Sequence, residues 1–224
     1  MIALAPIGRR SAMYNPRHFE ETRVDVLHQL MRAEPFAMLV TMGAGVLDAN
    51  HLPLELDAEP APLGTLRGHV SRANDVWRTS DPAVEALVVF QGPQRYVTPE
   101  WYPTKAETGK VVPTWNYVVV HAYGTPRFVE DVGWLRAHVG RLTAIHEAGR
   151  ERPWQVSDAP DDYVAGQLKG IVGFELAITR LTGKWKVSQN RVEADRVGVT
   201  AGLRAAGDPT SAVMADLVER GTGH

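Results

Sequence analysis

The sequence contains no cysteine. This absence excludes disulfide bonds, a thiolate nucleophile and a thiolate-ligated metal, and it fits a reducing cytoplasm. A long apolar run is also missing. The N-terminal segment MIALAPIGRRS places its apolar residues before its arginines, which is the reverse of a secretory signal, and no later segment approaches the length of a membrane span. We therefore expect a cytoplasmic protein without a membrane anchor.

Positive charge is not in excess. The formal net charge is −2 and the sequence pI is about 6.4, so no global positive field attracts nucleic acid. The helices expected at 22–32 and 131–147 also lack the basic, polar face with which a helix reads a DNA groove. The composition therefore disfavours direct DNA binding.

Several catalytic motifs are absent as well. The chain has no nucleophile elbow, no Walker loop and no glycine-rich dinucleotide motif. His51, His69 and His121 fall on different expected strands, and His146 is not followed by the second histidine of a zinc-protease helix. We expect no metal site.

The hydrophobic pattern predicts a mainly β protein with peripheral helices, an α+β fold. With 224 residues, 44% hydrophobic and 22% charged, the chain is long enough to bury a core without disulfides. About six strands are expected, at 36–42, 46–56, 65–70, 83–91, 114–129 and 170–181. The first two form a hairpin, Gly92-Pro93 ends the fourth, and the fifth bends near 124–126. This number of strands favours a small closed barrel over a parallel doubly wound sheet.

Helices are predicted from periodicity and capping residues. The segment 22–32 forms an amphipathic helix with Thr22 as N-cap, and 131–147 forms the longest helix with Asp131 as N-cap. The apolar face of that longest helix comprises Leu135, Val139, Leu142 and Ile145. Shorter helices are expected at 75–78, after 158–160 and at 212–220, and exposed connections at 58–64 and 103–110.

Two segments carry the residue types of a ligand site. The stretch from Tyr96 to Gly124 combines aromatic rings with hydrogen-bonding groups and a lysine, which suits a heterocycle with an anionic tail, or else an aromatic strand pair in a core. The segment GHVSRAND, residues 68–75, runs from a strand into a helix start. Its free N–H groups, with Ser71 and Arg72, could cradle a phosphate, or Ser71 and Asn74 could simply cap the helix. The residues alone leave both pairs of alternatives open.

Three motifs together resemble one known family. YVTPEWYPTK (96–105), VPTWNYVVVHAYG (112–124) and KVSQNR (186–191) occur in the order found in the PaiB family, described as FMN-binding negative transcriptional regulators. Their fold is a split β-barrel related to pyridoxamine-phosphate oxidases. The likeness extends from about Met13 to about Leu203, so we expect an N-terminal extension at 1–12, an FMN-binding split-barrel domain at 13–206 and a C-terminal tail at 207–224.

The resemblance implies a homodimer with FMN bound at the subunit interface by residues of both subunits. Lys105 and Arg191 are the cations expected to bind the phosphate, Asn116 to read the pyrimidine edge, and Trp115 to cover a ring. Mapped onto this sequence, the implied cofactor-binding residues are His69, Ser71, Arg72, Asn74, Thr98, Lys105, Thr114, Trp115, Asn116, Ser188, Gln189, Asn190 and Arg191.

Three functions follow from this resemblance. The first is an FMN-binding regulator that acts through flavin redox state, a small ligand or another protein. The second is an FMN-dependent oxidoreductase that takes electrons from NADH or NADPH, in which the cofactor carries the redox chemistry. The third is a protein that binds haem or another planar ligand in the aromatic pocket. The sequence leaves open whether the protein is an enzyme, and on which substrate.

Overall fold

The computed structural model describes residues 13–221, so the N-terminal extension expected at 1–12 lies outside the described residues. Residues 13–221 form ten β-strands and seven α-helices, which confirms the α+β class. Within this range no helix is both long and apolar enough to cross a bilayer. The chain divides into two compact units: a larger unit of Glu21–Gln94 and Tyr117–Gly183, and a smaller unit of Met1–Glu20, Arg95–Asn116 and Lys184–His224.

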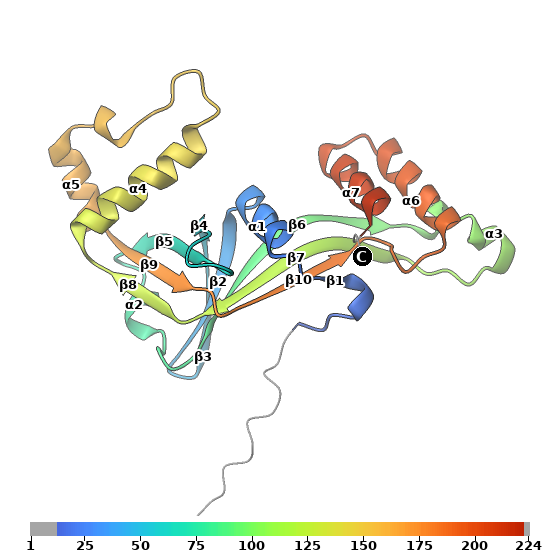
Figure 1. Cartoon of the computed structure of the whole chain (residues 1–224), viewed down its shortest axis with the longest axis horizontal. Helices are drawn as coiled ribbons and strands as arrows, with labels where there is room; N and C mark the ends of the chain where they lie inside the picture. The colour runs from blue at the N-terminus through green and yellow to red at the C-terminus, as the bar shows by residue number, and fades with distance from the viewer. Residues whose placement is uncertain (1–12, 222–224) are drawn as a thin grey trace, which may run out of the picture. The chain divides into compact units, whose positions relative to one another are not determined.

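The strands form two antiparallel sheets (Figure 1). One has six strands in the order β1-β10-β7-β6-β2-β3, and the other has four in the order β4-β5-β9-β8. Strands β1, β6, β7 and β10 contribute residues to both units. The strands are β1 (Glu20–Glu21), β2 (Phe36–Gly43), β3 (Val46–Pro53), β4 (Glu55–Asp57), β5 (Thr65–Ser71), β6 (Ala86–Val97), β7 (Thr114–Gly124), β8 (Pro126–Val129), β9 (Ile171–Ala177) and β10 (Arg180–Lys186).

The helices lie between and after these strands. They are α1 (Val24–Ala33), α2 (Val76–Thr79), α3 (Thr104–Thr108), α4 (Val132–Glu147), α5 (Asp161–Lys169), α6 (Glu193–Ala205) and α7 (Pro209–Arg220). Three 3-10 turns, η1 (Arg17–Phe19), η2 (Pro99–Trp101) and η3 (Val156–Asp158), complete the description.

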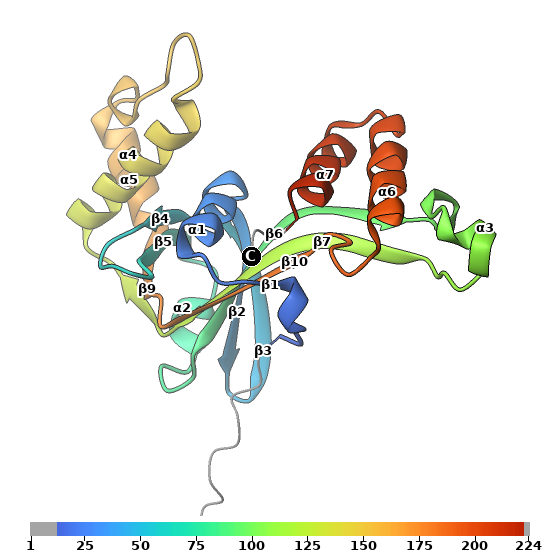
Figure 2. The ribbon, with the colours of Figure 1, turned by 45° about the vertical axis from the view of Figure 1, so that its right-hand side comes forward.

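The four-stranded sheet has one apolar and one polar face. On β5, Leu66 and Val70 point to the buried inner face, and their register partners on β9 are Leu176 and Val172. Arg67 and His69 alternate with them and point to the outer face. Helix α4 packs on the sheet on this outer side, so both faces of the sheet are covered in the larger unit (Figures 1 and 2).

Two expected strands are each divided between the two sheets. The expected strand 46–56 becomes β3 and β4, which separate at Leu54, and the expected strand 114–129 becomes β7 and β8. The predicted bend at 124–126 is therefore a change of sheet. A Cβ on Gly124 would lie 2.3 Å from the carbonyl oxygen of Ala177, so only glycine permits this close crossing.

The prediction that Gly92-Pro93 ends a strand is wrong, because β6 continues through both residues to Val97. Pairing of β6 with β2 covers only Leu87–Val89, so the missing N–H of Pro93 interrupts no bond of that ladder. The prediction that 170–181 is the last strand is also wrong, since β10 follows it. The fold consequently has more strands than the six that the pattern predicted.

The helix predictions are partly confirmed. Asp131 caps α4 as expected, because its Oδ1 accepts a hydrogen bond of 2.7 Å from the N–H of Trp134. The N-cap of α1, however, is Arg23 and not Thr22. In α4, Leu135 and Leu142 are buried as predicted, whereas Ile145 is 55% exposed and His138 is fully buried instead. Helix α3 forms inside the connection expected at 103–110, and α6 was not predicted.

The smaller unit is built on the helix pair α6 and α7, which lie side by side in Figures 1 and 2. Val199 and Leu203 of α6 and Met214 and Val218 of α7 are fully buried, so the pair has its own apolar core. The helix predicted at 212–220 is confirmed as part of α7, which starts at Pro209 with Asp208 as N-cap.

Candidate functional site

Several predicted residues of the smaller unit gather around the turn that follows β10. Asn116, near the start of β7, donates from Nδ2 to Oγ of Ser188 at 2.9 Å, and the Ser188 hydroxyl donates to Asn116 Oδ1 at 3.2 Å. The two side chains are 1% and 3% exposed. Ser188 also has a backbone φ of 64°, a left-handed conformation that costs a non-glycine residue energy. These two hydrogen bonds therefore hold the KVSQNR turn in place, and they use the polar atoms of both side chains.

Gln189 serves the same turn. Its side-chain oxygen accepts from the N–H of Val187 at 2.8 Å, and its amide nitrogen donates to the carbonyl oxygen of Trp185 at 2.5 Å. Asn190, the next residue, is exposed. Ser188 and Gln189 thus shape the turn, with Val187 buried before them and Asn190 exposed after them.

Two cations flank the turn. Lys186 Nζ donates to Thr114 Oγ1 and to the carbonyl oxygen of Trp115, each at 2.5 Å, and the Arg191 guanidinium lies over the Tyr102 ring, 4.7 Å from its centroid. Within residues 13–221, the contacts of these two cations include no ion pair with a carboxylate. Burial lowers the pKa of Lys186, and the positive charges of Lys184 and Arg191 lower it further. A cluster of cations that repel one another in this way is suited to an anion such as a phosphate.

The other predicted residues of this unit lie along the aromatic stretch. Tyr96 and Trp115 are 46% and 54% exposed and meet edge to face, with ring centroids 5.9 Å apart. Lys105 forms an ion pair with Glu100, and Thr98 caps η2 by accepting from the Glu100 N–H at 3.3 Å. Lys105 therefore already has a counter-ion, which makes it a weaker candidate for phosphate binding than Lys186.

Lys186 is the functional candidate that the sequence prediction omitted. It is the first residue of the KVSQNR motif, and it alternates with Lys184 along β10. That alternation places both lysines on one face of the strand, which was the available signal.

The predicted residues of the larger unit are His69, Ser71, Arg72 and Asn74. His69 Nδ1 lies 3.2 Å from Nε2 of His138, and Ser71 Oγ accepts from the N–H of Ala73 at 3.3 Å. Asn74 donates to Asn50 Oδ1 at 2.5 Å and accepts from the N–H of Val76 at 2.9 Å, at the start of α2. Asn74 is therefore engaged in the local helix start, which is one of the two alternatives that the sequence left open.

Arg72 is tied into the structure through its whole guanidinium group. It donates to Glu130 Oε2 at 2.5 Å, to the carbonyl oxygen of Lys169 at 2.9 Å and to that of Ile171 at 3.3 Å. These contacts join the end of β5 to the segments before α4 and after α5. Their number indicates a structural role for Arg72, and binding of a phosphate would require some of them to be exchanged.

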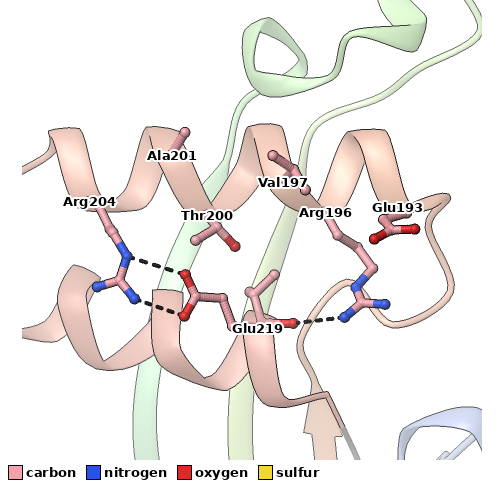
Figure 3. Close-up of a pocket in the computed structure, with 8 residues that line it drawn as sticks. Glu193, Arg196, Val197, Thr200, Ala201, Arg204 and Glu219 are labelled. Atoms are coloured by element: carbon pink, nitrogen blue, oxygen red, sulfur yellow. Dashed lines mark hydrogen bonds and ion pairs between the residues drawn. The ribbon is translucent and has the colours of Figure 1, made fainter.

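A separate groove of about 420 Å³ lies between α6 and α7 (Figure 3). Val197, Thr200 and Ala201 line it on α6. At one end Arg204 binds Glu219 through two nitrogens, at 3.3 and 2.9 Å, and near the other end Arg196 donates to the Val218 carbonyl oxygen at 3.4 Å. Arg204 and Glu219, the charged pair of this groove, already bind each other. We therefore place the candidate site at the KVSQNR turn.

No metal centre is evident in the described part of the chain: residues 13–221 contain no group of three or more His, Asp or Glu side chains that could hold an ion. The candidate site offers ammonium, guanidinium, amide and hydroxyl donors beside aromatic rings. This combination suits an anionic aromatic ligand.

Comparison with known proteins agrees with this ligand class. A family described as "Putative FMN-binding domain" matches residues 13–180. The chain is 35% identical over 245 residues to the uncharacterized protein AN0679 of Emericella nidulans, covering 93% of this chain and 98% of that protein. It is 31% identical over 207 residues to the protease synthase and sporulation protein PAI 2 of Bacillus subtilis, covering 92% of this chain and 97% of that protein.

A solved structure gives the fold. The FAD and heme binding protein from Mycobacterium smegmatis matches with a TM-score of 0.54 and 16% identity, over 75% of this chain and 73% of that chain. The likeness confirms the expected split β-barrel.

Proposed function

Because the chain belongs to the family of FMN-binding domains that includes the PaiB proteins, we propose that it binds flavin mononucleotide. The observation that carries this proposal is the pair Lys186 and Arg191, two cations without a carboxylate partner in the described chain, beside a hydrogen-bonded turn. They bind the phosphate, and the exposed rings of Tyr96 and Trp115 offer apolar surface to the flavin. The flavin, when bound, supplies one- or two-electron redox chemistry, and the protein supplies binding and orientation.

We also propose that the protein is a homodimer. The larger unit exposes an apolar face of the β2–β3 hairpin, on which Met42 is paired with Leu47 and Val40 with Ala49. Phe36 and Leu47 are each 66% exposed there. An apolar sheet face of this kind is costly in water, and a second copy of the same chain would cover it. In the proposed assembly the flavin lies at the subunit interface.

The proposed cellular role is negative regulation of transcription through the bound flavin, as in the PaiB family, without direct contact to DNA. The described helices of the smaller unit support the absence of direct DNA contact. On α6 and α7, Arg204 and Arg220 are matched by Asp216 and Glu219, so the pair presents no basic face. The same flavin site would serve a second candidate, an FMN-dependent oxidoreductase that uses NADH or NADPH, because a bound flavin itself carries the redox chemistry.

An absorption spectrum after addition of excess FMN and desalting tests the binding proposal. We expect flavin bands at about one flavin per chain, and a parallel titration with FAD separates the two flavins. Oxidation of NADH or NADPH by the loaded protein would favour the enzyme, and a Soret band after reconstitution would indicate haem binding instead. A protein that retains none of these ligands would overturn the proposal.

Substitution of the two cations tests the assignment of the phosphate site. We expect Lys186→Gln and Arg191→Gln each to raise the Kd for FMN on the order of tenfold, because each removes a charged hydrogen-bond donor. Lys169→Gln, which changes an exposed lysine on α5, is the matched control and should leave the Kd unchanged. If wild-type protein binds FMN and both variants bind equally well, the phosphate lies elsewhere.

A further inference from the structure

The polar outer face of the four-stranded sheet carries a row of alternating charges. Glu55, Arg67, Glu175 and Arg127 are direct register partners on β4, β5, β9 and β8. Arg67 Nε donates to Glu175 Oε1 at 2.9 Å, and Arg127 also binds Glu175. Helix α4 covers this face, although most helices pack on a sheet through apolar side chains.

Part of the contact between α4 and the sheet is polar, and we call this part the α4 seam (Glu55, His69, Trp134, His138 and Arg141). Beside it, Leu135 of α4 packs in an apolar cluster with α5 and Ile171 of β9. The Trp134 ring fills the space over Gly173, where a Cβ would lie 2.2 Å from Trp134 Cζ3. One turn later His138 stacks on Trp134 and reaches His69 on β5, and Arg141 Nε donates to Glu55 Oε1 at 2.7 Å. The seam therefore consists of a chain of groups: Arg141, Glu55, His138 and His69.

His138 is the critical member of this chain. It is fully buried, and its Nδ1 lies 3.5 Å from Glu55 Oε2. Both of these atoms are buried without a hydrogen-bond partner among the described residues. On the other side of the ring, Nε2 faces His69 Nδ1 at 3.2 Å. Two imidazole nitrogens at this distance share one proton, since one must donate and the other accept.

From this geometry we propose that the α4 seam is an acid-sensitive latch: protonation of both His69 and His138 releases α4 from the sheet. Two protonated rings would direct N–H groups at each other and lose their hydrogen bond. They would also add positive charge beneath the helix beside Arg141. Glu55, already bound by Arg141, is the carboxylate nearest to His138, while Glu175 is bound by Arg67 and Arg127.

The pKa values of the two histidines are shifted in the direction that the latch requires. Burial and then the positive charge of His69 lower the pKa of His138 to about 4, although Glu55 opposes this shift. Burial also lowers the pKa of His69. A free imidazole has a pKa of about 6.5, so the released state binds more protons than the docked state between about pH 6.5 and 4. Docking of α4 is therefore fully stable above this window and weakens as the pH falls through it.

A thiol placed under α4 reports its release, because the chain has no other cysteine. Leu142→Cys puts the thiol at a buried position of α4, and Ala144→Cys puts it at an exposed position of the same helix. The ratio of their reaction rates with a methanethiosulfonate cancels the pH dependence of the thiol itself. We expect the rate for Leu142→Cys relative to that for Ala144→Cys to rise at least about tenfold from pH 7.5 to pH 4.5. A tenfold rise is the effect of a histidine pKa that is one unit lower in the docked state than in the released state.

Four further variants complete the test. His69→Gln and His138→Gln, each in the Leu142→Cys background, should abolish the pH dependence, and His146→Gln, an exposed histidine of α4, should preserve it. Val88→Cys in the core of the larger unit should stay unreactive throughout. A flat ratio in the parent, an unchanged rise in both histidine variants, or reaction of Val88→Cys in step with Leu142→Cys would overturn the latch. If His138→Gln does not fold, His69→Gln decides alone.

Discussion

Single residues of the candidate site divide into those that build it and those that face outward. Asn116 and Ser188 were predicted to contact the ligand, but their polar atoms bond to each other and almost no surface of either is exposed. Lys186 and Arg191 flank the same turn and lack carboxylate partners in the described chain. We therefore propose that the two cations bind the ligand and that the buried pair positions the turn.

Loss of the buried pair should destabilise the turn and weaken binding indirectly. We expect Asn116→Ala to lower the free energy of unfolding by about 1–3 kcal/mol, because it leaves the buried Ser188 hydroxyl without a partner. Urea unfolding of the apoprotein measures this effect. Asn190→Ala, which changes the exposed neighbour, should stay within about 0.5 kcal/mol of wild type. Equal stabilities of the two variants would mean that the Asn116–Ser188 pair does not support the turn.

The sequence identified the residue types of this site, but it did not show which of them are buried in the turn and which are available to a ligand. Asn116 lies in a strand where side chains alternate between faces, and nothing in its local pattern distinguishes the buried face from the exposed one. The partner that buries it, Ser188, is distant in sequence.

At the scale of elements, the packing of α4 depends on one missing side chain. Gly173 on β9 leaves the space that Trp134 occupies, and we expect Gly173→Ala to lower the free energy of unfolding by about 1–3 kcal/mol through overpacking. Thermal unfolding measures the loss. Gly140→Ala on α4 has no atom within 4 Å of the new Cβ and should raise stability by about 0.5–1 kcal/mol. A neutral Gly173→Ala variant would show that Trp134 can move aside freely.

Elements that pack through apolar side chains were predictable from the sequence, and contacts made through buried polar side chains were not. Helix periodicity placed Leu135 and Leu142 inside correctly: Leu135 packs in an apolar cluster with α5, and Leu142 is buried. The same rule placed Ile145 inside, whereas the sheet beneath α4 offers His69 and Glu55, and His138 is the residue that meets them. A pattern within one helix carries no information on the polarity of the surface it covers. Similarly, β10 was missed because its polar residues mask the alternation of a strand.

At the scale of the whole molecule, the proposed homodimer can be tested through the exposed face of β2. We expect wild-type protein to elute as a dimer of twice 24.6 kDa in size-exclusion chromatography with light scattering. Val40→Glu places a charge at the centre of the apolar face and should shift the protein to monomer. Val213→Glu, at an exposed valine of α7, should leave the dimer intact. A wild-type monomer, or a dimer unaffected by Val40→Glu, would contradict the proposed interface.

Fold class and family were accessible from sequence because both rest on patterns that span most of the chain. Alternation predicted strands in segments that do form β-structure, although it missed β10, and three ordered motifs indicated the family that the comparison confirms. The division of strands between two sheets was not accessible. It depends on close crossings such as Gly124 against Ala177, which join segments far apart in sequence.

The row Glu55–Arg67–Glu175–Arg127 also has a consequence for how the four-stranded sheet is assembled. Opposite charges meet only when all four strands adopt the observed alignment. A shift of β9 by two residues would place Gly173 or Ala177 opposite Arg67, and a shift by one would turn the charges toward the apolar side. The row thus discriminates against misaligned sheets while the chain folds. It also leaves the edge strand β4 with two acidic side chains, which discourages this edge from adding strands of other molecules.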